Sequence, residues 1–135
     1  MGKLRCTCGH VIVDQTDNIE YKGYILPDTH VDRVSRMLTD SIDKLLDAIR
    51  LNKRLDWIKN NFSVPPYPTD VKDSGMIHDL LSGVIVDTTQ DIFQCEMCAR
   101  IAIQVGQSNQ FKFFSPDTDD TLGILNGNKK AQPLT

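Results

Sequence analysis

Four cysteines in two close pairs constrain the fold more than any other feature of this sequence. Cys6 and Cys8 lie in LRCTCGHVIVD near the start of the chain, and Cys95 and Cys98 lie in FQCEMCARIAI far downstream. Each pair falls in a predicted tight turn beside a predicted strand, which is the local setting of a zinc knuckle. Two such turns supply four thiolates, a complete tetrahedral set. The sequence therefore predicts one structural Zn²⁺ that fastens the start of the domain to its end.

The first cysteine pair departs from the usual spacing. Zinc ribbons more often have two residues between the cysteines, whereas only Thr7 separates Cys6 from Cys8. His10 is therefore a reserve ligand if either thiolate cannot reach the metal. Gly9 fits a knuckle, because the residue just after the second thiolate should tolerate positive φ. A site with four cysteine ligands is closed to water, so we expect a structural and not a catalytic metal.

Other uses of the four thiols stay open. A Cys-x-x-Cys redox pair would place Cys95 at the N-terminus of a helix, whereas strands are predicted around it. An iron–sulfur cluster and unrelated buried thiols are the remaining alternatives. The N-terminal MGKLRCTCG lacks the apolar segment of a secretory signal, and no apolar run approaches the roughly 18 residues that span a bilayer. We therefore expect a cytoplasmic protein without membrane contact, where disulfides are disfavoured.

Helical periodicity marks the middle of the chain. Apolar residues from Val31 to Ile49 recur at spacings of three and four, which predicts a helix over about 29–52, with Asp28 or Thr29 as its N-cap. The helix continues or restarts through LDWIKNNF until the prolines of SVPPYPTD end it. MIHDLLSGVIV predicts a further helix over about 74–90.

Short β-rich segments occupy both ends of the chain. Residues 3–14 read as strand, turn and strand, residues 19–26 as a further strand or an extended loop, and residues 100–115 as a hairpin. The predicted class is α+β, with zinc-ribbon-like antiparallel hairpins from both chain ends and a helical insertion of two or three helices at about 28–90. We expect one zinc-stabilised domain over residues 1–125, because 135 residues suit a single domain, and a flexible tail over 126–135.

Charge is unevenly distributed. Residues 70–120 carry three basic and nine acidic side chains, a local net charge of −6 within a chain whose total is −3. Such a surface suits a basic protein partner and disfavours nucleic acid, which needs a basic face. Six acidic residues in two stretches are our candidates for the contact surface: Asp87, Asp91, Glu96, Asp117, Asp119 and Asp120.

The chain carries no motif for catalysis. It has no phosphate-binding loop, dinucleotide fingerprint or serine nucleophile motif, and we predict that it is not an enzyme. An alternative function is a nucleic-acid-binding zinc ribbon of a transcription or translation accessory factor. The basic residues of the first helical region would then make the contacts: Arg50, Lys53, Arg54 and Lys59.

Three segments together resemble a known group of proteins. CTCGHVIVDQTD, YKGYILPD and CEMCARIAIQ…NQFKFFSPD are similar to a loose group of small bacterial zinc-ribbon proteins of unknown biochemistry. Some members of that group are associated with polymorphic toxin systems as immunity proteins. The resemblance covers about forty residues at the two ends and carries over no catalytic residue. It implies a protein partner, a cognate bacterial toxin, that this chain would neutralise by direct contact.

Overall fold

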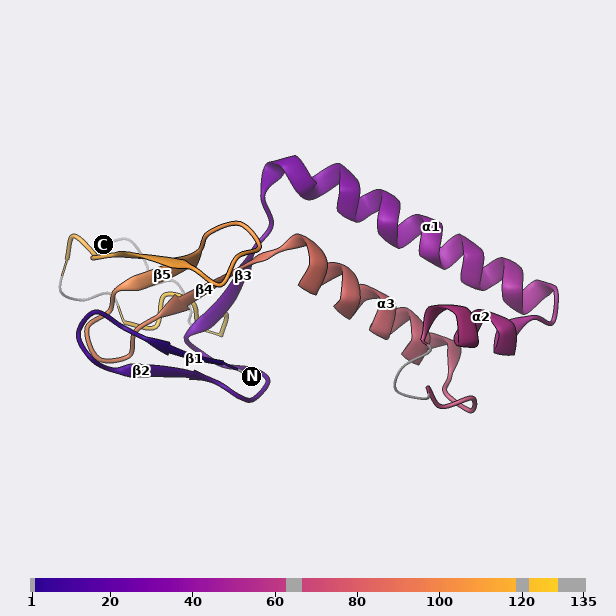
Figure 1. Ribbon diagram of the computed structural model, residues 1–135, viewed down its shortest axis with the longest axis horizontal. Helices are drawn as coiled ribbons and strands as arrows, with labels where there is room; N and C mark the ends of the chain where they lie inside the picture. The colour runs from indigo at the N-terminus through magenta and orange to yellow at the C-terminus, as the bar shows by residue number, and fades with distance from the viewer. Residues whose placement is uncertain (1, 63–66, 119–121, 129–135) are drawn as a thin grey trace. The chain divides into compact units, whose positions relative to one another are not determined.

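The computed structural model describes residues 2–62, 67–118 and 122–128, and it confirms the predicted α+β class with hairpins at both ends and a helical insertion (Figure 1). Three strands come first, then three α-helices, then three further strands. The strands are β1 (Gly2–Arg5), β2 (Val11–Asp14), β3 (Lys22–Ile25), β4 (Gln90–Gln94), β5 (Ile101–Gln104) and β6 (Phe111–Phe114), and the helices are α1 (Val31–Arg50), α2 (Arg54–Asn61) and α3 (Asp73–Thr88).

The chain divides into two compact units. The first, which we call the β unit, combines Met1–Ile25 with Thr89–Thr135, and the second, the helical unit, is Leu26–Thr88. The helical unit is thus inserted between two strands of the β unit. Of the predicted flexible tail at 126–135, residues 129–135 lie outside the described residues.

The β unit contains two antiparallel sheets. Strands β1 and β2 form a two-stranded hairpin, and the other four strands form a sheet in the order β3-β4-β5-β6. Ile25 at the end of β3 pairs with Gln90 at the start of β4, so the helical unit occupies the position of a hairpin loop. The β5–β6 pair confirms the predicted hairpin, and alternation leaves Phe114 exposed while Phe111 and Phe113 are half-buried.

The core of the β unit is small and includes two of the cysteines. Its buried members come from both sheets and from both cysteine turns, so the two hairpins meet there. They are Cys6, Ile12, Phe93, Cys95 and Ala102. Such a short list of buried apolar side chains indicates that burial alone stabilises this unit only modestly.

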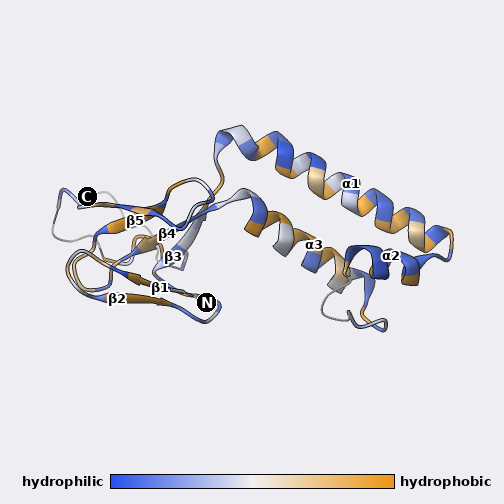
Figure 2. Cartoon of the chain, in the orientation of Figure 1, coloured by the Kyte–Doolittle hydropathy of each residue, from blue (hydrophilic) through white to orange (hydrophobic). Residues whose placement is uncertain are grey.

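The helical unit has a core of its own. In α1 the apolar stripe predicted from the sequence alternates with charged residues, as Figure 2 shows, and the helix packs on both α2 and α3. The buried members of this core are Leu45, Ala48, Trp57, Ile58 and Met76. Asn52, at φ +55°, separates α1 from α2. Of the two alternatives expected for LDWIKNNF, a continued helix and a new one, the structure therefore shows a new helix.

The predicted N-cap of the first helix is wrong. A single 3₁₀ turn, Asp28–His30, precedes α1, and neither that turn nor α1 has a side-chain cap. The backbone N–H of His30 instead donates to the Pro27 carbonyl at 2.8 Å. The ring Nδ1 of His30 lies 2.8 Å from the Thr88 carbonyl oxygen. His30 thereby links the two ends of the helical unit.

Within the described part of the chain, none of the helices is both long enough and apolar enough to cross a bilayer.

Candidate metal centre

The turn after β1 is a tight backbone loop that closes on itself. The N–H of Cys6 donates to the His10 carbonyl at 2.8 Å, and the N–H of Gly9 donates to the Cys6 carbonyl at 2.9 Å. Gly9 adopts φ +98°, as the sequence predicts for the residue that follows the second thiolate. A residue with a Cβ would be strained in that conformation. The loop therefore holds Cys6 and Cys8 on one side of the turn.

The turn after β4 repeats the same hydrogen bonds. The N–H of Cys95 donates to the Arg100 carbonyl at 2.8 Å, and the N–H of Ala99 donates to the Cys95 carbonyl at 2.9 Å. Ala99 occupies the place of Gly9 and has φ +64° although it carries a side chain. Arg100 likewise occupies the place of His10. Neither equivalence was predicted from the sequence, although an alignment of CxCGH with CxxCAR would have indicated both.

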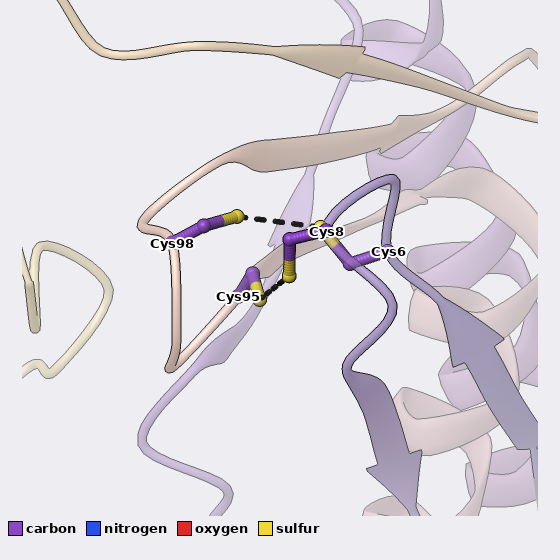
Figure 3. Close-up of side chains that lie close together, drawn as sticks. All are labelled: Cys6, Cys8, Cys95 and Cys98. Atoms are coloured by element: carbon purple, nitrogen blue, oxygen red, sulfur yellow. Dashed lines mark hydrogen bonds between the residues drawn. The ribbon is translucent and has the colours of Figure 1, made fainter.

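The two turns bring the four cysteines together. Their sulfur atoms all lie within 4.8 Å of one another, so a single metal ion could contact all four. The shortest distances join sulfurs of opposite turns, 3.5 Å from Cys6 to Cys98 and 3.7 Å from Cys8 to Cys95 (Figure 3). Both distances far exceed the roughly 2.05 Å of a disulfide, and the four cysteines are free. Cys8 is exposed, whereas Cys6 and Cys95 are buried.

Backbone N–H groups point at the sulfurs of the second turn. Burial is the largest influence on Cys95 and, with the neighbouring thiols, raises its pKa to about 12, although N–H groups of Cys98 and Met97 act against it. Burial also acts to raise the pKa of Cys98. The backbone N–H and the guanidinium of Arg100, together with the Cys6 and Cys8 thiols, have a stronger effect in the opposite direction. They lower the pKa of Cys98 to about 6. These donors would equally stabilise thiolates that ligate a metal.

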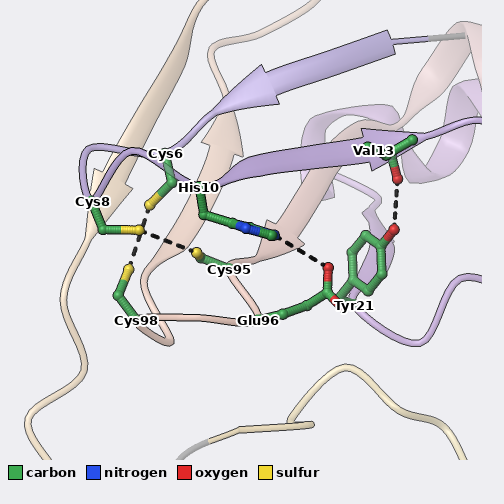
Figure 4. Close-up of polar contacts among 8 residues, drawn as sticks. All are labelled: Cys6, Cys8, His10, Val13, Tyr21, Cys95, Glu96 and Cys98. Atoms are coloured by element: carbon green, nitrogen blue, oxygen red, sulfur yellow. Dashed lines mark hydrogen bonds and ion pairs between the residues drawn. The ribbon is translucent and has the colours of Figure 1, made fainter.

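His10, the reserve ligand, lies outside the sulfur cluster. Its side chain points away from the sulfurs, and Nε2 lies 3.6 Å from a carboxylate oxygen of Glu96 on the opposite turn (Figure 4). Nε2 is buried and makes no hydrogen bond within the described ranges. The His10 carbonyl closes its own turn, as described above. The structure therefore gives His10 a role in shaping the first turn rather than a place among the four sulfurs.

The predicted contact residues belong to different units of the structure. Asp87 is exposed on α3 in the helical unit, whereas Asp91, Glu96 and Asp117 belong to the β unit. Glu96 lies beside the metal centre and Asp91 is half-buried in β4. Asp119 and Asp120 lie outside the described residues.

Two of the basic side chains named for nucleic-acid contact already have partners. Arg54 donates to the Asp73 carboxylate at 3.1 Å, to the Thr69 carbonyl at 3.0 Å and to the Val71 carbonyl. Arg50 lies 3.5 Å from Asp47 one turn earlier on α1. Lys53 and Lys59 are exposed. Arg54 thus fastens the segment before α3 to α2, which reduces the positive charge that this region offers a nucleic acid.

Replacing Gly9 tests whether the first turn requires a residue that tolerates positive φ. A Cβ at Gly9 would meet no atom within 4 Å, so its cost is confined to the backbone at φ +98°. We expect Gly9→Ala to cost about 1–2 kcal/mol and to weaken metal binding about tenfold. Competition with a chromogenic chelator measures the change. Gly127→Ala is the matched control, because its Cβ also meets nothing and no strain is expected there. Equal affinities of the two variants would contradict the role of Gly9.

The fold and the site define an α+β protein whose two chain ends meet at a four-cysteine centre that could hold a metal ion. Residues 2–118 match the family described as Domain of unknown function (DUF8617), and the chain belongs to that family. No curated protein matches the chain, and no solved structure matches it.

Proposed function

We propose that the four cysteines bind one structural Zn²⁺. Thiolates bind zinc tetrahedrally at about 2.3 Å, which places the sulfurs about 3.8 Å apart. The cross-turn distances of 3.5 and 3.7 Å fit that spacing. Four thiolates around Zn²⁺ carry a net charge of about −2, which the Arg100 guanidinium beside Cys98 partly offsets. Soft sulfur donors with N–H groups directed at them favour zinc among common divalent ions.

We further propose that the chain is a non-enzymatic binding protein, specifically an immunity protein that neutralises a bacterial toxin by direct contact. The observation that carries this proposal is the cluster of four sulfurs, because a metal ion held by all four cysteines would have no coordination position left for a substrate. The resemblance of both chain ends to toxin-associated zinc-ribbon proteins supports the immunity role. Acidic side chains that remain half-buried or exposed on the β unit, such as Asp91 and Glu96, suit a basic partner.

Co-purification with the protein encoded beside this chain's gene tests the immunity role. We expect a stoichiometric complex that abolishes the toxicity of that protein when the two are expressed together. Electrostatic steering should make association faster at low salt, which stopped-flow mixing at two ionic strengths measures.

Charge reversal separates a specific contact from general acidity. Glu96→Lys should weaken the complex, whereas Glu20→Lys, which reverses an exposed carboxylate in the β2–β3 connection, should not. A neighbouring toxin that the chain neither binds nor neutralises would overturn the immunity proposal. Equal weakening by both variants would show that only net charge matters.

A further inference from the structure

A cleft of about 310 Å³ opens between the two sheets of the β unit. Leu4 and Ile12 line it from the hairpin β1–β2, and Phe93 and Phe111 line it from the larger sheet. These four side chains are apolar and buried or half-buried. The carboxylates of Asp14 and Asp91 and the amide of Gln104 stand among the polar groups of the lining. The cleft thus combines apolar walls with two carboxylates.

Strand β1 presents an unpaired edge at this cleft. Cys6 and His10 form a hydrogen-bonded pair at the turn, and such pairs alternate along an antiparallel ladder. Lys3 and Arg5 are therefore the β1 residues whose backbone N–H and C=O groups point away from β2. Among the residues that the structure describes, no strand lies on that side, because the sheet consists of β1 and β2 alone. Gly2, Lys3 and Leu4 all line the cleft.

The other edge of this hairpin is already in use. The Tyr21 hydroxyl donates to the Val13 carbonyl of β2 at 2.7 Å (Figure 4). An added strand would therefore find β1, and not β2, available. Main-chain hydrogen bonds to such an edge are a recurrent way in which proteins bind extended segments.

The chemistry of the carboxylates favours a cation. Lys22 already provides one example of a cation bound in this region. Its ammonium lies 2.7 Å from an Asp14 oxygen and 5.4 Å from the centroid of the Phe93 ring. The Asp91 carboxylate forms no direct ion pair and accepts no side-chain hydrogen bond in the described ranges, although it lies close enough to the Lys22 ammonium to interact with it electrostatically. A half-buried carboxylate in an apolar cleft is stabilised when a cation reaches it.

We propose that this cleft binds an extended segment of a protein partner, which adds as a strand to the free edge of β1 and directs one arginine or lysine side chain to Asp91. The aliphatic stem of that side chain lies against Leu4 and Phe93, and its charged head meets the carboxylate. This inference rests on the proposed binding function and specifies where and how it acts. The partner is recognised by backbone shape and by one cation.

The charges of β1 define the other face of the bound segment. Lys3 and Arg5 carry exposed side chains on the opposite side of β1 from Leu4. Residues of the bound segment that lie beside them should be neutral or acidic, because like charges on adjacent strands repel. The expected pattern is therefore a basic residue toward the cleft, flanked by neutral or acidic residues.

Matched peptides test the proposal directly on the zinc-loaded full chain. The probe is an acetylated and amidated Thr-Val-Arg-Val-Thr, and the control has glutamate in place of arginine. In ¹H–¹⁵N spectra we expect the arginine peptide to shift the amides of Lys3, Arg5 and Asp91, and the glutamate peptide to shift none of them. The absence of shifts with the arginine peptide up to its solubility limit, or equal shifts with both peptides, would overturn the proposal.

Variants separate the two halves of the contact. Asp91→Asn should weaken the arginine peptide at least about tenfold, whereas Asp117→Asn, outside the cleft, should not. Lys3→Pro removes an edge N–H that β2 does not use, and it should abolish binding that Lys3→Ala preserves. Unchanged zinc content and amide dispersion verify that each variant folds. If acetylated arginine amide binds as tightly as the peptide, the cleft takes a cation alone and strand addition is wrong.

The outcomes for the cleft and for the immunity role are distinguishable. If neither Asp91→Asn nor Lys3→Pro weakens the toxin complex, the proposed binding of a strand in the cleft is wrong, while the proposed binding function is retained. If the peptide binds but no toxin complex forms, the proposed immunity role is wrong, while the proposed binding of a strand in the cleft is retained.

Discussion

Removal of the metal with a chelator is expected to unfold the β unit and to leave the helical unit folded. Two of the five buried core residues of the β unit, Cys6 and Cys95, are proposed ligands, so the metal lies within the core that it would stabilise. Structural zinc contributes about 10–16 kcal/mol in small zinc-finger peptides. Whole domains are stable by about 5–15 kcal/mol. Loss of the metal therefore removes an amount comparable to the total stability of this unit.

The chain carries its own reporters for this experiment. Trp57 is the single tryptophan and is buried in the core of the helical unit, so its fluorescence reports on that unit alone. We expect tryptophan emission and helical circular dichroism to persist after chelation. The amide resonances of residues 2–25 and 89–118 should collapse toward random-coil values. Elemental analysis before chelation should give one zinc per chain, and excess zinc should restore the spectrum.

Two results would contradict this expectation. Retention of the dispersed amides of the β unit after complete metal removal would show that the metal is not structural. Loss of the Trp57 signal in step with the metal would show that the two units fold as one. Cys95→Ser provides an independent form of metal loss and should reproduce the effect of the chelator.

Excision of the helical unit is expected to leave a β unit that folds and binds the metal. Ile25 and Gln90 are paired across β3 and β4. The N–H of Gln94 donates to the Tyr21 carbonyl at 2.9 Å, and the alternation of hydrogen-bonded pairs makes Ile25 and Gln90 such a pair too. A pair of that kind is what a two-residue type I′ turn connects. Residues 26–89 can therefore be replaced by Asn-Gly.

The excised protein should bind the metal no more weakly than the full chain. Cys8 and Cys95 are 87 positions apart in the sequence, and the shorter connection lowers the entropy cost of bringing them together, by about 1 kcal/mol at most. Competition with a chelator compares the two affinities, and amide spectra compare the folds. The same excised chain with Cys95→Ser is the control that should not bind. An excised chain that neither folds nor binds metal would show that the β unit requires the helices.

Local pattern was sufficient to predict the elements and the cysteine cluster. Spacings of three and four gave the stripe of α1, and β-branched runs beside the cysteines gave the hairpins. The four cysteines could be grouped because metal coordination demands four donors wherever they lie in the chain. The positive φ of Gly9 could be predicted because glycine commonly adopts it. Ala99 also has a positive φ, but alanine gives no such indication in the sequence.

Features that depend on tertiary contact were out of reach. The orientation of His10 toward Glu96 is set by the opposite turn, which lies far away in the sequence. The break at Asn52, by contrast, is local: Asn52 adopts φ +55°, and the N–H of Lys53 donates to the Ala48 carbonyl at 2.8 Å, so the sequence signal was the asparagine itself. The cleft at Asp91 exists because two separate sheets meet, and no local pattern in either sheet encodes the space between them.

The free edge of β1 is also a site at which copies of the chain could aggregate. Two such edges from neighbouring molecules could join as an antiparallel ladder, the first step of edge-to-edge aggregation. In that ladder Lys3 and Arg5 of one molecule would face the same two cations of the other. Their mutual repulsion opposes the ladder, as lysines on exposed edges do in other sheets. Concentrated solutions of the protein should consequently become turbid when Lys3 and Arg5 are neutralised, while its metal content stays the same.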